Sequence, residues 1–415
     1  MLETRILLIG SELTEGRIAD QNGRFLAAEL TDLGFFVRDI QMVPDDKVQL
    51  RAVMQEMLAS GVALILSSGG LGHTSDDLTA VLWAEVLRDS LVLSEEMLAH
   101  LQKQLHARGI SSLPYLERYA LVPERGKAFV NPIGLAPALC WERDSQMVWA
   151  LPGPPSELRA IWYASIKPKL QERFPLRPPK QYLVRTTGIS ESRLSALIDS
   201  WEKALPDTFR LAYNPSWEGV TLRLRAPADT ETDLILDRVE ELRAILRPYI
   251  YAEGDISLSE ALLQLMKEKG LSLAIAESCT GGALSAEIVK VAGASEVLMG
   301  AVVAYANLLK QQLLGVSPYT LETEGAVSEA TALQMAEGAR KVASADIGLS
   351  TTGIAGPAGG SPNKPVGTVW IGLSTPWGAS AKKYNFSGDR QTIIQRGVAA
   401  ALSFLWQNLT RNLYS

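Results

Sequence analysis

The sequence predicts an α/β protein, with two α/β domains that have parallel-rich sheets, joined by a small α+β domain. Short apolar runs alternate with helical patterns in the first and last parts of the chain, which is typical of parallel sheets covered by helices. A proline-rich segment, 174–179, interrupts this alternation and indicates a domain boundary. The length of 415 residues leaves room for about two to four domains.

The first domain is predicted over residues 1–172. Apolar runs indicate its strands, and helical periodicity indicates the segments between them. We expect strands at 5–9, 35–43, 62–67 and 148–151, and helices at 22–33 and 48–59.

The second domain is predicted over 175–253 and the third over 256–415. In the second we expect strands at 181–187 and 220–226, and helices at 190–201 and 231–246. The third is again α/β, with strands expected at 271–276, 300–304, 347–350 and 383–386, and a helix at 283–291.

Composition limits the classes of partner and location. A net charge of −6 with scattered basic residues disfavours nucleic acid as a partner. Two cysteines are too few for a disulfide framework, so we expect free thiols and a cytoplasmic location. We expect neither a signal peptide nor a membrane span, since no segment offers about 18 uninterrupted apolar residues. His73, His100 and His106 lie far upstream of Cys279, which disfavours a Cys/His pair and a histidine-rich zinc site.

The segment 277–282, Glu-Ser-Cys-Thr-Gly-Gly, stands between a predicted buried strand and a predicted helix. A serine at such a turn can project from the sheet edge, and nearby backbone amides can approach a ligand at the helix N-terminus. A plain helix N-cap is the alternative explanation of Ser278.

Three more clusters follow in the third domain. Tyr305 and Lys310 are polar groups at the end of an apolar strand. The glycine-rich segment 351–360 indicates either a loop that touches a ligand closely or a flexible hairpin. Arg390 can bind a phosphate or carboxylate, or form a surface ion pair. The candidate ligand contacts are Thr280, Gly281, Gly282, Thr351, Thr352, Gly353, Gly356, Gly359 and Arg390.

A serine and a lysine without a histidine can still perform acyl transfer, including amide hydrolysis. A neutral lysine activates the serine if burial or nearby positive charge lowers the lysine pKa. The amides of residues 279–282 are candidates for the oxyanion hole that this chemistry requires.

Five motifs in one order make residues 257–405 similar to the C-terminal domain of the competence/damage-inducible CinA proteins, which is also the nicotinamide mononucleotide deamidase domain. The motifs are AESCTGG, YANxxKxxLLGV, TTGIAGPxGG, KPVGTV and FxGDR. The resemblance implies hydrolysis of nicotinamide mononucleotide to nicotinate mononucleotide and ammonia, without a cofactor, in pyridine nucleotide salvage. It implies that Ser278 is the nucleophile and Lys310 its base, with Tyr305 beside them. Arg390 and the segment 351–360 would hold the nucleotide.

The first domain has its own glycine-rich turn, after the predicted strand 62–67. Its glycines allow a close backbone approach to an anion, and Asp76 and Asp77 either cap the next helix or hold a divalent metal ion. Further turn-rich segments follow near the other strands. The candidate site residues here are Glu12, Gly69, Gly70, Gly72, Thr74, Asp76, Asp77, Asn131, Gly153 and Glu157.

The motifs GGLGxTxDD, NxxGxAP and LPGxPxE make residues 1–170 similar to the molybdopterin-binding domain found at the N-terminus of CinA. Three departures are His73 in place of a proline, the segment 13–16, and Ala138 in place of a glycine. For this domain the resemblance implies an ADP-ribose pyrophosphatase with a divalent metal ion. A domain that only binds a nucleotide or a pterin phosphate is the alternative.

Residues 175–253 resemble the KH-like connecting domain of full-length CinA. Gly188-Ile189-Ser190-Glu191 lacks the second glycine of an RNA-binding loop and adds an acid, so we expect a structural or dimerising role. The resemblance also implies a homodimer. Of two classes of function, a hydrolase of pyridine nucleotides is favoured over a non-catalytic competence or recombination partner. A binding protein has no need of an activated serine.

Overall fold

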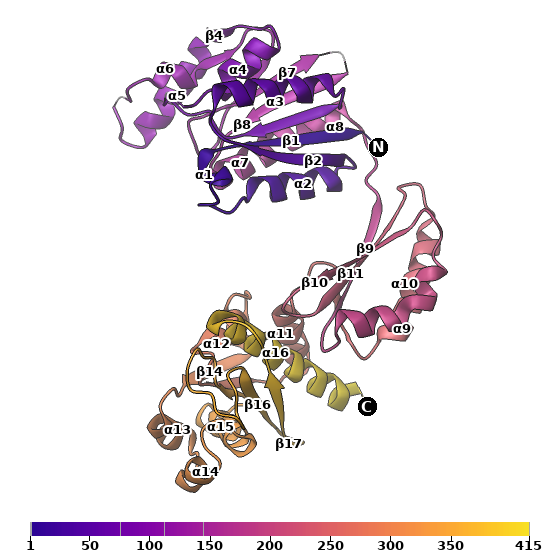
Figure 1. Ribbon diagram of the computed structural model, residues 1–415, viewed down its shortest axis with the longest axis vertical. Coiled ribbons are helices and arrows are strands. Elements are labelled where there is room, and N and C mark those ends of the chain that lie inside the picture. The colour runs from indigo at the N-terminus through magenta and orange to yellow at the C-terminus, as the bar shows by residue number, and fades with distance from the viewer. Residues whose placement is uncertain (1, 75, 112, 144, 415) are drawn as a thin grey trace. The chain divides into compact units, whose positions relative to one another are not determined.

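The structure, a computed structural model, describes residues 2–74, 76–111, 113–143 and 145–414. The chain forms two units, Met1–Pro179 and Lys180–Ser415, and each is described by itself. The first unit is one α/β domain, and the second is a small α+β domain followed by another α/β domain (Figure 1). The predicted fold class is therefore confirmed.

A six-stranded sheet with the order β2-β1-β3-β8-β7-β6 forms the centre of the first unit. The strands β2, β1, β3 and β8 are parallel, and β7 and β6 add an antiparallel edge. Their bounds are β1 Glu3–Ile9, β2 Phe36–Val43, β3 Leu64–Ser68, β6 Lys127–Phe129, β7 Ala138–Arg143 and β8 Gln146–Leu151.

Helices cover both faces of this sheet. Ile6 and Leu8 of β1 face one core with α2, α7 and α8, while Leu7 and Ile9 face the other with α3 and α4. Because both faces are buried, β1 is a continuous apolar run without polar alternation. The remaining bounds are α1 Ser11–Thr14, α2 Asn22–Asp32, α3 Lys47–Ala59, α4 Thr79–Val86, β4 Leu91–Leu93, α5 Glu95–Ala107, α6 Leu116–Tyr119, β5 Leu121–Pro123, α7 Pro155–Ile161, η1 Trp162–Ile166 and α8 Lys167–Arg173.

The small domain of the second unit is an antiparallel sheet with the order β10-β11-β9-β12 and two helices that share its core. Residues of β11 alternate between buried and half-buried, as expected of a sheet with one covered face. The bounds are β9 Lys180–Thr186, α9 Glu191–Lys203, β10 Arg210–Pro215, β11 Val220–Ala226, α10 Thr232–Leu246 and β12 Ile250–Glu253.

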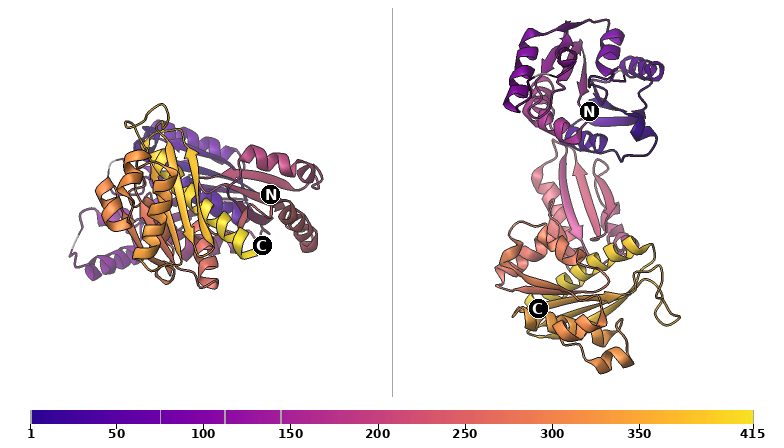
Figure 2. Two further views of the ribbon diagram at one scale, coloured as in Figure 1. Left: turned by 90° about the horizontal axis from the view of Figure 1, so that it is seen from below. Right: turned by 90° about the vertical axis from the view of Figure 1, so that its left-hand side faces the viewer.

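The last domain has a five-stranded sheet with the order β14-β13-β15-β16-β17, in which the first three strands are parallel. The helices α11, α12 and α16 cover one face, and α13, α14 and α15 cover the other (Figure 2). A capping box of Ser257 and Glu260 begins α11. The bounds are α11 Leu258–Glu268, β13 Leu273–Glu277, α12 Ala283–Val289, η2 Ala294–Glu296, β14 Leu298–Val303, α13 Asn307–Leu314, α14 Pro318–Thr323, α15 Glu329–Val342, β15 Ile347–Gly353, β16 Thr368–Thr375, β17 Gly378–Asn385 and α16 Arg390–Tyr414.

Within the described part of the chain, no helix combines the length and the apolar character that a membrane crossing requires.

Candidate active site

Ser278 and Lys310 meet in the interior of the last domain. Ser278 directly follows β13, and its backbone N–H donates to the carbonyl of Thr351 on the neighbouring strand at 2.9 Å. Lys310 reaches it from α13, with Nζ 3.0 Å from Ser278 Oγ. The lysine is only 1% exposed. The structure therefore brings the predicted nucleophile and base into direct contact.

Two backbone carbonyls complete the surroundings of Lys310. Nζ lies 2.8 Å from the oxygen of Ala304 and 3.1 Å from that of Tyr305. A neutral amine has two N–H donors and one lone pair, so the two carbonyls can accept its hydrogens while the lone pair faces the serine hydroxyl. Burial lowers the pKa of Lys310 because desolvation disfavours the ammonium form. The contact with Ser278 and the direction of the pKa shift both favour Lys310 as a general base.

Cys279, the neighbour of Ser278, is a poor alternative nucleophile. Its side chain is buried, and burial raises the pKa of the thiol to about 12. Because the thiolate is the reactive form, a thiol that stays protonated near neutral pH is unreactive.

Glu277 is a buried neighbour of Ser278 to which the sequence analysis assigned no role. Its carboxylate is fully buried and accepts from the backbone N–H groups of Gly282, Leu284 and Ser285 at 2.8–3.0 Å, and from the Ser285 hydroxyl. A carboxylate at a helix N-terminus satisfies unpaired amides and the helix dipole. Because the Glu277 carboxylate takes the amides of Gly282, Leu284 and Ser285, these three amides of α12 cannot also donate to a ligand.

This cap also limits the candidates for an oxyanion hole. The amide of Gly281 donates to the carbonyl of Ser278, and that of Gly282 donates to Glu277. Among the described residues, no backbone carbonyl accepts from the amides of Cys279 and Thr280, and the Cys279 amide contacts only its own thiol. These two amides, directly after the nucleophile, remain to bind a developing oxyanion.

Three of the predicted ligand contacts lie in a strand and not in a loop. Thr351, Thr352 and Gly353 end β15, and both threonines are fully buried. The hydroxyls of Thr351 and Thr280 lie 2.6 Å apart, and that of Thr352 donates to the carbonyl of Ala326. The hydrogen bonds of the threonine side chains thus connect the 277–282 turn to the end of β15, and β15 to Ala326.

Arg390 joins three segments at the mouth of the site. Its Nη1 donates to the carbonyl of Gly356 at 2.7 Å, and its Nη2 donates to the hydroxyl of Tyr305 at 3.0 Å. Gly359 lies further along the same loop. None of the ion pairs among the described residues includes Arg390, so its positive charge has no carboxylate partner. The alternative of a surface ion pair is therefore excluded for the described chain, and an anion can bind here.

The candidate residues of the first domain surround a separate cavity of about 550 Å³ at the carboxyl ends of β1, β3 and β8. The turn after β3 passes close to β1, since a Cβ on Gly69 would lie 2.1 Å from the Ile9 carbonyl oxygen. The predicted residues that line the cavity are Glu12, Gly69, Gly70, Thr74, Asp76, Asp77 and Gly153.

Three predicted site residues lie outside the lining of this cavity: Asn131, Glu157 and Gly72. Asn131 is buried and donates to Glu157 Oε2 at 2.7 Å, while its Oδ1 accepts from the backbone of its own turn. Glu157 and Asp77 nevertheless both act on Tyr119, whose pKa is raised by burial and by these two carboxylates. Gly72 packs against the Asp77 carboxylate.

The cavity is strongly acidic, and among the described residues neither a lysine nor an arginine lines it. Asp20 and Asp45, which the sequence analysis missed, join Glu12, Asp76 and Asp77 in the lining. Asp77 also accepts from the amide and the hydroxyl of Thr74. No group of three or more potential ligands converges on one point among the described residues. A divalent metal fits here only with additional oxygen ligands, such as those of a bound phosphate.

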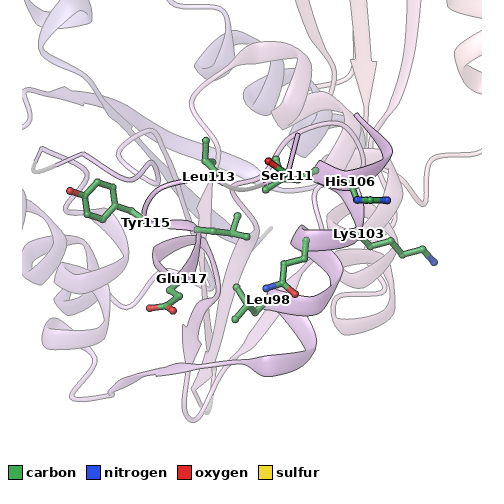
Figure 3. A pocket seen from close by; sticks show the side chains of 10 residues that line it. Leu98, Lys103, His106, Ser111, Leu113, Tyr115 and Glu117 are labelled. Carbon is green, nitrogen blue, oxygen red and sulfur yellow. The ribbon is translucent and has the colours of Figure 1, made fainter. Parts of the chain in front are cut away.

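A further cavity of about 730 Å³ lies beside α5 and contains none of the predicted site residues (Figure 3). Its lining includes Lys103 and His106 of α5, together with Tyr115 and Glu117 at the start of α6.

Three family models match the chain. The model of the CinA C-terminal domain matches residues 255–409. The model described as "Probable molybdopterin binding domain" matches 5–172, and that of the damage-inducible protein CinA KH domain matches 181–252.

Relatives match over the full length. A "CinA-like protein" of Syntrophotalea carbinolica is 37% identical, with all of both chains covered. A "CinA-like protein" of Thermotoga maritima is 38% identical, with 98% of each chain covered. Among solved structures, a competence/damage inducible protein of Agrobacterium tumefaciens is 38% identical over 36% of this chain and 93% of its own, with a TM-score of 0.36.

Proposed function

Because the chain belongs to the CinA family, as its full-length relatives and family models confirm, we propose that its last domain is a nicotinamide mononucleotide amidohydrolase. The reaction yields nicotinate mononucleotide and ammonia and serves pyridine nucleotide salvage. The observation that supports it most is the buried contact of 3.0 Å between Lys310 Nζ and Ser278 Oγ.

In the proposed reaction, Ser278 Oγ attacks the carboxamide carbon while neutral Lys310 takes the hydroxyl proton. The amides of Cys279 and Thr280 bind the oxyanion, and the new ammonium of Lys310 gives its proton to the departing nitrogen, so ammonia leaves. Water then attacks the ester carbon, again with Lys310 as base, and Ser278 recovers its proton as nicotinate mononucleotide departs. Arg390 binds the phosphate, and Tyr305 orients Arg390.

The test is ammonia release from nicotinamide mononucleotide by the full-length protein beside Ser278→Ala and Lys310→Ala, with Lys341→Ala as an exposed lysine control. We expect release by the parent and the control only. If Ser278→Ala still releases ammonia, another group is the nucleophile. If the parent releases none, the alternative of a non-catalytic binding role in competence is favoured.

For the first domain we propose hydrolysis of ADP-ribose with a divalent metal ion. The acidic cavity supports it, because a pyrophosphate can enter a cavity lined by five carboxylates only together with cations. Asp76 or Asp77 would hold the metal ion, which would supply positive charge to the pyrophosphate and make a water molecule more acidic. ADP-ribose turnover by the full chain, with and without added metal, tests this. Metal-dependent binding without turnover leaves a binding-only domain.

We further propose a cytoplasmic homodimer. Both cysteines are free thiols, which fits a reducing compartment. Light scattering of the purified chain measures the mass directly.

A further inference from the structure

A third cavity, of about 590 Å³, lies within the second unit, where the small domain meets β17 and α16. Its walls come from the β9–α9 loop, the β10–β11 turn, the end of β17 and one side of α16. None of its lining residues belongs to the Ser278 site or to the acidic cavity of the first domain.

Three aromatic rings line this cavity. Tyr384 and Phe386 are stacked, with ring centroids 5.5 Å apart and an interplanar angle of 17°. Trp217, on the β10–β11 turn, is 53% exposed. An exposed indole that belongs to the lining of a cavity offers a surface on which a planar ring can stack.

Two cations accompany the rings. The Arg396 guanidinium lies over the Trp217 ring at 5.7 Å, and Lys382 Nζ lies over the Tyr384 ring at 5.1 Å. Within the described residues, Arg396 makes hydrogen bonds only through Nη1, to Ser387. Its Nε and Nη2 hydrogens remain available, and a guanidinium can bind phosphate or carboxylate through two of them.

The loop geometry and the mixed charge of this cavity do not suit a nucleic acid strand. A Cβ on Gly188 would lie 1.6 Å from Gln407 Nε2, so the loop that contacts the backbone in RNA-binding KH modules is packed against α16. Glu191 and Glu218 also line the cavity and offset its two cations. A ligand with one ring and one anionic group satisfies this lining better than a polyanion does.

We propose that this cavity is a further small-molecule site, for a ligand that joins a planar aromatic ring to one anionic group. A mononucleotide is the simplest compound of this class. Its base stacks on Trp217 or on the Tyr384–Phe386 pair, and its phosphate binds Arg396. This inference does not depend on the amidohydrolase activity.

The test is calorimetric titration of AMP into the full-length protein with a chelator present, which keeps metal from the first domain. We expect saturable binding that weakens about tenfold or more in Trp217→Ala, the usual loss when a stacking ring is removed. Arg396→Gln should weaken it similarly. Trp377→Ala, which removes an exposed tryptophan outside the cavity, is the matched control and should bind like the parent.

Two further variants and one further probe make the result decisive. Trp217→Phe keeps a ring and should retain most of the affinity, and Arg390→Ala should not change it. The proposal is wrong if AMP does not bind, if binding follows Arg390 and not Trp217, or if a single-stranded oligonucleotide binds far more tightly than AMP.

Discussion

At the scale of single residues, the charge state of Lys310 decides whether Ser278 can be activated. Burial lowers its pKa below the ordinary lysine value of 10.5, so the neutral base exists at a lower pH than on a free lysine. We expect kcat/KM for ammonia release to rise with pH through this lowered pKa and to level off below pH 10.5. A rate that follows only the ordinary lysine value would contradict the assignment.

The same pKa affects stability. The unfolded chain binds the Lys310 proton more tightly than the folded chain. Folding stability therefore rises with pH between the lowered pKa and 10.5. Below the lowered pKa, the buried ammonium destabilises the fold by its full amount. Lys310→Met should therefore raise the thermal midpoint at low and neutral pH while it lowers ammonia release by about a hundredfold or more. Thermal scans at several pH values measure this. A variant with a lower midpoint throughout would show that the lysine stabilises the fold.

Glu277 supports the site by accepting hydrogen bonds from backbone amides, and we do not expect it to bind the substrate. Glu277→Gln replaces a carboxylate that accepts four hydrogen bonds by an amide with one acceptor oxygen, so donors are left unpaired. We expect a loss of about 1–3 kcal/mol in stability. We also expect a lower kcat with a smaller change in KM, because the turn that holds Ser278 shifts. Glu287→Gln changes a glutamate of α12, the helix that Glu277 caps, that is paired to exposed Lys290, and it should change little.

At the scale of elements, the start of α16 connects the loop after β15 to the segment before α13. Arg390 makes this connection with two nitrogens of one guanidinium, to Gly356 and Tyr305. Arg390→Lys keeps the charge but not the planar fork, so we expect KM to rise more than kcat falls. Steady-state kinetics measure both, with exposed Arg411→Lys, near the other end of α16, as control. Equal effects of the two variants would remove Arg390 from the nucleotide site.

At the scale of the whole molecule, the two proposed reactions use different units of the chain and different chemistry. A chelator should abolish ADP-ribose hydrolysis and leave ammonia release unchanged, because the Ser278 mechanism needs no metal. Asp76→Asn and Ser278→Ala should each remove one activity only. Loss of both activities on chelation would require a metal in the last domain as well.

Much of the architecture followed from the sequence because its signals are local. The apolar run of β1, the proline-rich boundary and the Ser278 turn each depend on neighbouring residues. The motifs also predicted Ser278, Lys310, Tyr305 and Arg390 as site residues, and the structure pairs Ser278 with Lys310 and Tyr305 with Arg390. The predicted loop at 351–353 was wrong, since strand pairing with β13 and β16 extends β15 through Gly353.

Only the tertiary structure decided how these residues act. Several contacts depend on where separate segments come together. They are the two carbonyls around Lys310 Nζ, the amides that donate to Glu277, and the shared cavity of Asp20, Asp45 and Asp76. The same is true of Trp217 and Arg396, which are distant in sequence but share one cavity. Sequence patterns report propensity and burial, whereas hydrogen-bond partners and pKa shifts depend on distances that folding alone sets.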